Sequence, residues 1–205
     1  MLRLLDPSSA GDCIFTIDDI DVFKLKRSSL RCSILAVPQD CVFLPDGSTI
    51  KSNIDPTESI TDHECTSILE KVQLSTFVLA KGGIEARMTG DELSAGQQQL
   101  FNLGRAIYRR MVRRRLSGHD GGLLLLDEMG SAVDSRTEAT MQKIIHEEFA
   151  TYTVIAITHH LHAALDFADR VAVLDKGTIV EVGAPKELLE RPNGTFRKLY
   201  LSGQK

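Results

Sequence analysis

Leu93-Ser94-Ala95-Gly96-Gln97 opens the stretch that decides the fold, and Leu123-Leu124-Leu125-Leu126-Asp127-Glu128 closes it. A serine followed three positions later by a glutamine is the pattern of a helix capping box, and helix N-termini favour anions. Four leucines followed by two carboxylates predict a buried strand that ends in oxygen ligands suited to Mg²⁺. Together the two patterns indicate phosphate and metal chemistry. Taken singly, they are also consistent with a capped helix without a ligand and with surface acids after a strand.

Alternating strand and helix patterns surround this stretch, which predicts an α/β fold with a mostly parallel sheet. Strand signals disappear between residues 50 and 120, where helical spacing of apolar residues takes over. We therefore expect a helical lobe inserted into an α/β core, with 1–49 as the first part of the core, 50–120 as the lobe and 121–205 as the second part. The predicted strands are 13–17, 33–37, 123–126, 153–158, 170–174 and 178–182, and the predicted helices are 59–72, one that starts near 96, 136–149, 161–167 and 185–190.

Composition narrows the class of protein. The chain has 205 residues, 42% of them hydrophobic and 25% charged, which is ordinary for a globular protein with a substantial core. A net charge of -4 argues against a nucleic-acid partner. The apolar runs are too short to span a bilayer, so the isolated chain has no predicted transmembrane segment. The four cysteines lack metal-ligand or disulfide spacing and are interpreted as free thiols: Cys13, Cys32, Cys41 and Cys65.

Two dense groups of side chains are interpreted as having no ligand. One is a basic helix end, interpreted as a solvated face because cations complement the dipole at a helix C-terminus. The other is a histidine group without cysteine or carboxylate partners at the spacing that zinc requires. The first group comprises Arg105, Arg109, Arg110, Arg113, Arg114 and Arg115, and the second His159, His160 and His162.

Polar side chains follow three of the predicted strands. Gln39 follows the strand that ends at Val37, Asp127 and Glu128 follow the leucines, and His159 follows Thr158. Ligands of open α/β sheets bind outside the carboxyl ends of the strands, so these side chains are expected to converge, although each could simply begin a loop. Asp127 is suited to hold Mg²⁺, and Glu128 to act as a general base on water.

In this order and spacing, the motifs resemble those of the nucleotide-binding domain of ABC transporters, which has a P-loop NTPase-like fold. The resemblance covers essentially the whole chain. It identifies Leu93–Gln97 as the signature motif, Leu123–Asp127 as the Walker B strand, Glu128 as the catalytic glutamate, Gln39 as the Q-loop residue, Ser131–Asp134 as the D-loop and His159 as the switch histidine. Residues 52–56 and 173–181 are similar to the second such domain of C-subfamily, multidrug-resistance-like exporters.

The resemblance implies ATP and Mg²⁺ as cofactors, held between two such domains that associate head to tail. It further implies transmembrane domains as partners and a location on the cytoplasmic side of a membrane. In that arrangement Ser94, Gly96 and Gln97 face the nucleotide of the partner domain, Gln39 and Asp127 serve Mg²⁺, Glu128 polarises water, His159 holds the γ-phosphate and Asp134 lies at the nucleotide through the D-loop.

The sequence also departs from the family pattern. It contains no G-x-x-x-x-G-K-[ST], the loop that cradles the β- and γ-phosphates, and Leu4 starts a segment like the one that follows this loop in the family. We therefore expect a fold without the N-terminal strands and the P-loop, with an uncovered sheet edge, weak ATP binding and poor behaviour in solution. Ala95 replaces a frequent glycine, and His160 a common arginine.

Three functions are compatible with these observations. The first is a truncated ATPase domain of an exporter, inactive when alone. The second is a non-catalytic partner domain that supplies Ser94–Gln97 in trans to the ATP of another domain. The third, an ATPase outside transport, is disfavoured by the C-subfamily-like segments.

Overall fold

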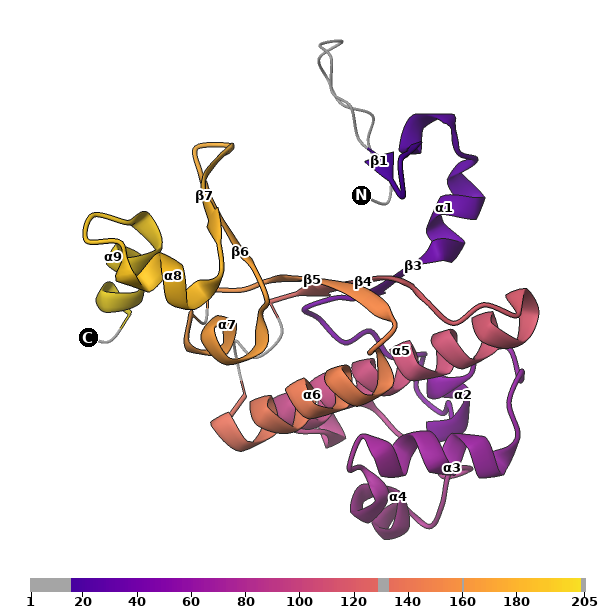
Figure 1. Cartoon of the computed structure of the whole chain (residues 1–205). Helices are drawn as coiled ribbons and strands as arrows, with labels where there is room; N and C mark the ends of the chain where they lie inside the picture. Colours follow the sequence, from indigo (N-terminus) through magenta and orange to yellow (C-terminus); the bar gives the residue numbers. More distant parts are fainter. Residues whose placement is uncertain (1–15, 129–132, 160, 204–205) are drawn as a thin grey trace.

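A three-stranded parallel sheet lies at the centre of the chain. The computed structural model describes residues 16–128, 133–159 and 161–203. In it, β4 (Gly122–Asp127) lies between β3 (Ile34–Val37) and β5 (Tyr152–Ile157), and both neighbours run parallel to it (Figure 1). Leu124 of β4 is completely buried, as the run of leucines predicts. The predicted α/β class is confirmed.

The remaining described strands form two separate antiparallel pairs. β1 (Thr16–Ile17) pairs with β2 (Ile20–Asp21), and β6 (Val171–Asp175) pairs with β7 (Thr178–Gly183). The turn between β6 and β7 places Lys176 at φ 47° and Gly177 at φ 81°, the left-handed conformation expected of this hairpin. Among the described strands, the parallel sheet is therefore smaller than the sequence predicts, because β6 pairs with β7 alone.

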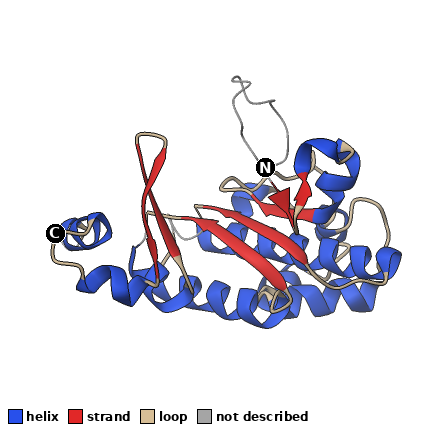
Figure 2. Cartoon of the chain, turned by 45° about the horizontal axis from the view of Figure 1, so that its top comes forward, coloured by secondary structure: helices blue, strands red, loops and turns tan. Residues whose placement is uncertain are grey.

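Two long helices cover one face of the parallel sheet. These are α5 (Ala95–Ser117) and α6 (Ser135–Glu148), with α2 (Ile50–Ile54), α3 (Asp62–Lys71) and α4 (Ser75–Lys81) beyond them (Figures 1 and 2). The predicted apolar face of α5 is buried at Leu100, Leu103 and Ile107. It packs with the sheet and α6 in one core, whose other members include Leu124, Leu126, Met141, Ile144, Ile145 and Phe149.

The other described helices lie on two sides of the sheet. The short 3₁₀ helix η1 (Val22–Lys24) and α1 (Arg27–Ser33) precede β3 on one side, and α7 (Leu161–Phe167), α8 (Pro185–Glu190) and α9 (Thr195–Ser202) follow β5 on the other. A second 3₁₀ helix, η2 (Gly90–Glu92), precedes α5. Within the described residues, no helix is both long enough and apolar enough to cross a membrane.

Apolar side chains are exposed on β5 and on the β6–β7 ribbon. Ile157 is 63% exposed, Leu174 69% and Ile179 62%. Exposure of several large apolar side chains is unusual for a monomer and is typical of surfaces that another segment or partner covers. It agrees with the expectation of an uncovered part of the sheet.

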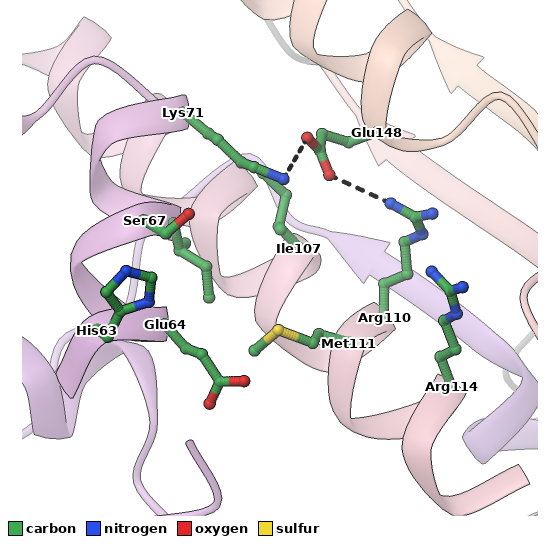
Figure 3. A pocket seen from close by; sticks show the side chains of 10 residues that line it. His63, Glu64, Ser67, Lys71, Ile107, Arg110, Met111, Arg114 and Glu148 are labelled. Atoms are coloured by element: carbon green, nitrogen blue, oxygen red, sulfur yellow. Dashed lines mark hydrogen bonds and ion pairs between the residues drawn. The ribbon is translucent and has the colours of Figure 1, made fainter. Parts of the chain in front are cut away.

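Ion pairs join α3, α5 and α6 beside a cavity of about 310 Å³. Glu148 accepts from Arg110 Nη1 at 3.2 Å and lies 2.6 Å from Lys71 Nζ (Figure 3). Arg110 also donates two hydrogen bonds to Asp120, from Nε to Oδ1 at 2.9 Å and from Nη2 to Oδ2 at 2.6 Å. The interpretation of the arginine group as a solvated face is therefore wrong for Arg110. Asp120 lies beyond the end of α5, ten residues after Arg110, and Glu148 lies on α6, 38 residues after it, so the helix pattern alone does not reveal these partners.

Replacing Asp120 with asparagine is expected to lower the free energy of unfolding at pH 7 by about 1–2 kcal/mol. The hydrogen bond from Arg110 lowers the pKa of the Asp120 carboxyl in the folded chain. A lowered folded pKa means that this stabilisation is complete above the unfolded value of about 3.9 and is lost as the pH falls through the folded pKa. Denaturant unfolding at pH 7 and near pH 3 measures this. The difference between the two proteins should be smaller near pH 3 than at pH 7, whereas an equal difference at both pH values contradicts the argument.

Asp62→Asn provides the control for that comparison. Asp62 pairs with Lys51 at 2.5 Å, but its side chain is 69% exposed. An exposed pair contributes little, so this variant should differ from the parent by less than about 0.5 kcal/mol at either pH.

Candidate functional site

Three strand ends bring Gln39, Glu128 and His159 together. The parallel register aligns Val37 with Leu126 and Asp127 with Ile157, so the carboxyl ends of β3, β4 and β5 share one edge of the sheet. Gln39 Nε2 donates to Glu128 Oε2 at 3.0 Å, and His159 Nδ1 lies 3.7 Å from Glu128 Oε1. The predicted convergence of these three side chains is observed.

Glu128 has a left-handed backbone, with φ 48°. Its N–H donates to the carbonyl of Ile157 at 2.9 Å, which continues the β4–β5 ladder by one bond beyond the last paired strand residue. A non-glycine residue in this conformation costs roughly 1–2 kcal/mol, and such strain concentrates at functional sites. The turn ends the strand and leaves the carboxylate 36% exposed at the sheet edge, between Gln39 and His159.

Asp127 is the last residue of β4 and is exposed at the same edge. No group of three or more His, Cys, Asp or Glu side chains suited to a metal occurs in the part of the chain that the structure describes. Mg²⁺ bound with a nucleotide commonly takes only one or two protein ligands, with phosphate oxygens and water completing its shell. Asp127 and the amide oxygen of Gln39 fit such a partial set, because Glu128 engages the amide nitrogen of Gln39 rather than its oxygen.

Ser94 and Gln97 form the predicted capping box at the start of α5. Ser94 Oγ accepts from the Gln97 N–H at 3.3 Å, and Gln97 Oε1 accepts from the Ser94 N–H at 2.9 Å. Ser94 is exposed and stands at the positive end of a 23-residue helix. A Cβ added at Gly96 would lie 3.1 Å from Thr137 Cγ2 of α6, so a larger side chain would be crowded here.

Asp134 is the N-cap of α6. Its carboxylate accepts from the N–H groups of Arg136 and Thr137, both at 3.0 Å, and from Thr137 Oγ1 at 2.7 Å. The Thr137 hydroxyl, followed by the backbone N–H groups, lowers the pKa of Asp134. These contacts give Asp134 a structural role, and its place at a nucleotide stays a prediction. Of the other residues named from the sequence, Leu4, Cys13, Ser131, Ala132 and His160 lie outside the described residues, as does the start of the predicted strand 13–17.

Three polar side chains on α5 belong to the surroundings of the site but were not identified from the sequence. Gln99, Asn102 and Arg105 occur at intervals of three and face the segment that carries Gln39. Arg105 is half-buried, and burial lowers its pKa, so its assignment to a solvated face is wrong. The available signal was polar residues at i, i+3 and i+6 beside the apolar face of one helix.

The fold is that of a P-loop NTPase-like nucleotide-binding domain, and this class rests on comparison with a solved structure. The structure of a bacterial Atm1-family ABC exporter with ATP bound matches all of this chain and 34% of that one, with a TM-score of 0.81 and 26% identity. ABC transporter FGM5 of Gibberella zeae is 47% identical over the whole chain, and ABC-type transporter braE of Annulohypoxylon truncatum is 47% identical over 99% of it. No protein-family model matches.

The chain belongs to the nucleotide-binding domains of the ABC transporters. Its similarity to the C subfamily is supported by ABC transporter C family member 9 of Arabidopsis thaliana, 35% identical over 97% of the chain, which spans 12% of that relative. The chain spans 14% of the length of each of the two fungal relatives.

Proposed function

We propose that the chain binds ATP and takes part in its hydrolysis within an ABC exporter, where hydrolysis is coupled to transport across a membrane. The observation that carries the proposal is the strand-end cluster, in which Gln39 Nε2 and His159 Nδ1 approach the two oxygens of Glu128. An amide, a carboxylate and an imidazole at one sheet edge can orient water and move a proton. The chain spans 14% of the length of these fungal relatives, so export and contact with membrane-spanning partners are proposed from its similarity to those longer proteins.

Each residue of the cluster has a distinct role in this proposal. Glu128 orients the attacking water and accepts its proton, since it is the carboxylate that both neighbours approach. His159 holds the γ-phosphate beside that water, and Gln39 with Asp127 supplies oxygen ligands to Mg²⁺. The bound Mg²⁺ offsets the negative charge that develops on the phosphates.

The signature end of α5 serves a second nucleotide. Ser94 and Gly96, with Gln97, stand at the N-terminus of a long helix, where an anion is favoured. We assign them to the ATP of a second domain that packs head to tail against this one, with Asp134 near that contact. The helical lobe of residues 50–120 and the α/β core of 1–49 and 121–205 are then the two parts that dimerisation aligns. Transmembrane domains contact this assembly from the membrane side.

A second candidate is a partner domain without turnover of its own. It is favoured by the absence of any G-x-x-x-x-G-K-[ST] in the 205 residues, whereas the capping box of the signature is intact. In this case Ser94 and Gly96 contact the ATP bound by the other domain, and Glu128 takes no part in hydrolysis.

Binding of a fluorescent ATP analogue to the isolated chain tests the role of the phosphate loop. Without that loop, we expect a Kd no tighter than about 1 mM, or roughly 4 kcal/mol of binding. Addition of the chain to an ABC transporter nucleotide-binding domain that contains the G-x-x-x-x-G-K-[ST] loop should nevertheless raise the ATPase rate of that domain. Gly96→Asp should abolish the increase by placing a crowded negative charge beside the phosphate. Micromolar binding that Asp127→Asn abolishes contradicts the first expectation, and an unchanged rate on mixing contradicts the role in trans.

A further inference from the structure

A row of polar side chains on α5 binds the segment that follows β3. We name Gln99, Asn102 and Arg105 the α5 ladder. Their intervals of three residues place them along one flank of the helix. Each donates to a different backbone carbonyl of the segment: Gln99 Nε2 to Gln39 O at 2.6 Å, Asn102 Nδ2 to Pro38 O at 3.4 Å and Arg105 Nη1 to Val42 O at 2.5 Å.

The ladder is reinforced through Cys41. Its Sγ donates to Asn102 Oδ1 at 3.1 Å, and Arg105 Nη1 lies 3.4 Å from the same oxygen. Burial raises the pKa of the Cys41 thiol to about 11, so the thiol keeps its proton and acts as a donor at neutral pH. Asn102 is 5% exposed. The segment is thus held to α5 through its side chains as well as through its backbone.

The same segment reaches the strand-end cluster on its other side. While the carbonyl of Gln39 accepts from Gln99, the side chain of Gln39 donates to Glu128 Oε2 at 3.0 Å. Two hydrogen bonds therefore connect α5 to Glu128. Gly96 lies one helical turn before Gln99 on the same helix, which makes the path from the signature end to Glu128 short and continuous.

The Gln99 amide is held in a fixed orientation. Only its nitrogen can donate to the carbonyl of Gln39, so its Oε1 must point the other way. That oxygen is buried and accepts no hydrogen bond from any described residue. An unsatisfied buried acceptor costs about 1–3 kcal/mol, so Gln99 contacts Gln39 although this arrangement leaves Gln99 Oε1 unpaired. A buried polar group left unpaired in this way calls for an explanation, and a role in positioning supplies one.

We propose that Gln99 is a positioning residue that ties Gln39, and through it Glu128, to the signature helix. A displacement of the Ser94 end of α5 by the nucleotide of a partner domain is then transmitted to the strand-end cluster of this chain. Two nucleotide sites, one at each end of this path, are thereby coupled. The biological meaning of the coupling rests on the proposed function, whereas the link itself is a property of the chain alone.

The link can be measured on the full chain without nucleotide. The side-chain NH₂ resonances of Gln39 in ¹⁵N NMR spectra report its hydrogen bond to Glu128, and hydrogen exchange reports opening of residues 39–44. Gln99→Ala, and Gln99→Glu with nearly the same shape but no NH₂ donor, should shift the Gln39 resonances and speed exchange in this segment by up to about tenfold. If Gln99→Glu leaves the segment unchanged, the proposal is overturned.

Gln98→Ala is the matched control. Gln98 is the adjacent residue, and its Nε2 donates to the carbonyls of Gly90 and Leu93 instead. This variant should leave the Gln39 resonances at their original positions. An equal shift in both variants would mean that the effect is general destabilisation of α5, and it would refute a specific role for Gln99. If Gln99→Ala does not fold, the comparison of Gln99→Glu with Gln98→Ala decides the question.

A double-variant experiment tests transmission along the path. Ser94→Ala removes the side-chain cap of α5 and should shift the Gln39 resonances in the parent chain. In the Gln99→Ala background the same change should have no effect on Gln39. A shift of equal size in both backgrounds overturns the proposal. Because no ATP is added, a failure of the chain to support ATP hydrolysis would refute the proposed function and leave this result standing.

Discussion

In the proposed ATPase, glutamine in place of Glu128 is expected to lower the rate of ATP hydrolysis by about 10²–10⁴-fold, the range typical for loss of a general base. The substitution keeps the size of the side chain and retains one oxygen that can accept from Gln39 Nε2, which now lies 3.0 Å from Glu128 Oε2. It removes the ability to take a proton from water. Binding of ATP should therefore stay within a few-fold of the parent value. The measurement is kcat beside the Kd for ATP under the same conditions.

Glu147→Gln serves as the control for that experiment. Glu147 also lies on the described surface, on α6, and its side chain is 59% exposed opposite Lys143. Its replacement should change kcat by less than about twofold, as expected for an exposed pair. If Glu128→Gln retains more than a tenth of the parent rate, Glu128 is not the base, and the partner-domain candidate gains support.

Methionine in place of Arg105 is expected to lower the free energy of unfolding by about 2 kcal/mol. The guanidinium carbon lies 5.1 Å from the Phe43 ring centre and 5.0 Å from that of Phe101, and Nε donates to the carbonyl of Asn53 at 2.7 Å. Methionine preserves much of the packing against the two rings. It leaves the Asn53 carbonyl without its donor and weakens the hold of α5 on Val42. Urea unfolding followed by circular dichroism measures the change.

Arg109→Met makes the comparison specific. Arg109 lies one turn further along α5 and is exposed. Both substitutions remove one positive charge from the same helix, so their difference isolates the buried contacts. Arg109→Met should stay within about 0.5 kcal/mol of the parent. Equal losses in the two variants would show that charge, rather than burial, accounts for the effect.

The features that the sequence predicts well depend on local signals. The capping box of Ser94 and Gln97 requires only two residues three apart, and it is present as predicted. The leucine strand follows from a continuous apolar run and the apolar face of α5 from helical periodicity; three of the four leucines and the apolar face of α5 are buried. The convergence of Gln39, Glu128 and His159 was predictable because parallel strands end at one edge.

The features that the sequence does not reveal depend on partners far along the chain. Arg105 binds the carbonyl of Asn53, 52 residues earlier, and Arg110 binds Glu148, 38 residues later. Nothing in the arginine-rich run separates these side chains from the exposed Arg109. The pairing of β6 with β7, and not with β5, also depends on which segment lies next to β5, and periodicity in the sequence does not indicate that. The left-handed backbone of Glu128 could not be predicted, because a positive φ is expected mainly of glycine.

The left-handed backbone of Glu128 destabilises the fold at a position where its carboxylate serves the proposed chemistry. Glycine would occupy φ 48° without strain, and an ordinary protein under selection for stability alone would favour it there. A carboxylate at the same point is held between an amide and an imidazole, at a place where only a sharp bend can present it. The chain therefore has a residue at this position whose backbone is more strained than that of glycine would be. If Glu128 acts as proposed, a lineage that did not need hydrolysis from this domain would be free to replace it, and substitution at residue 128 would be an early sign of that change.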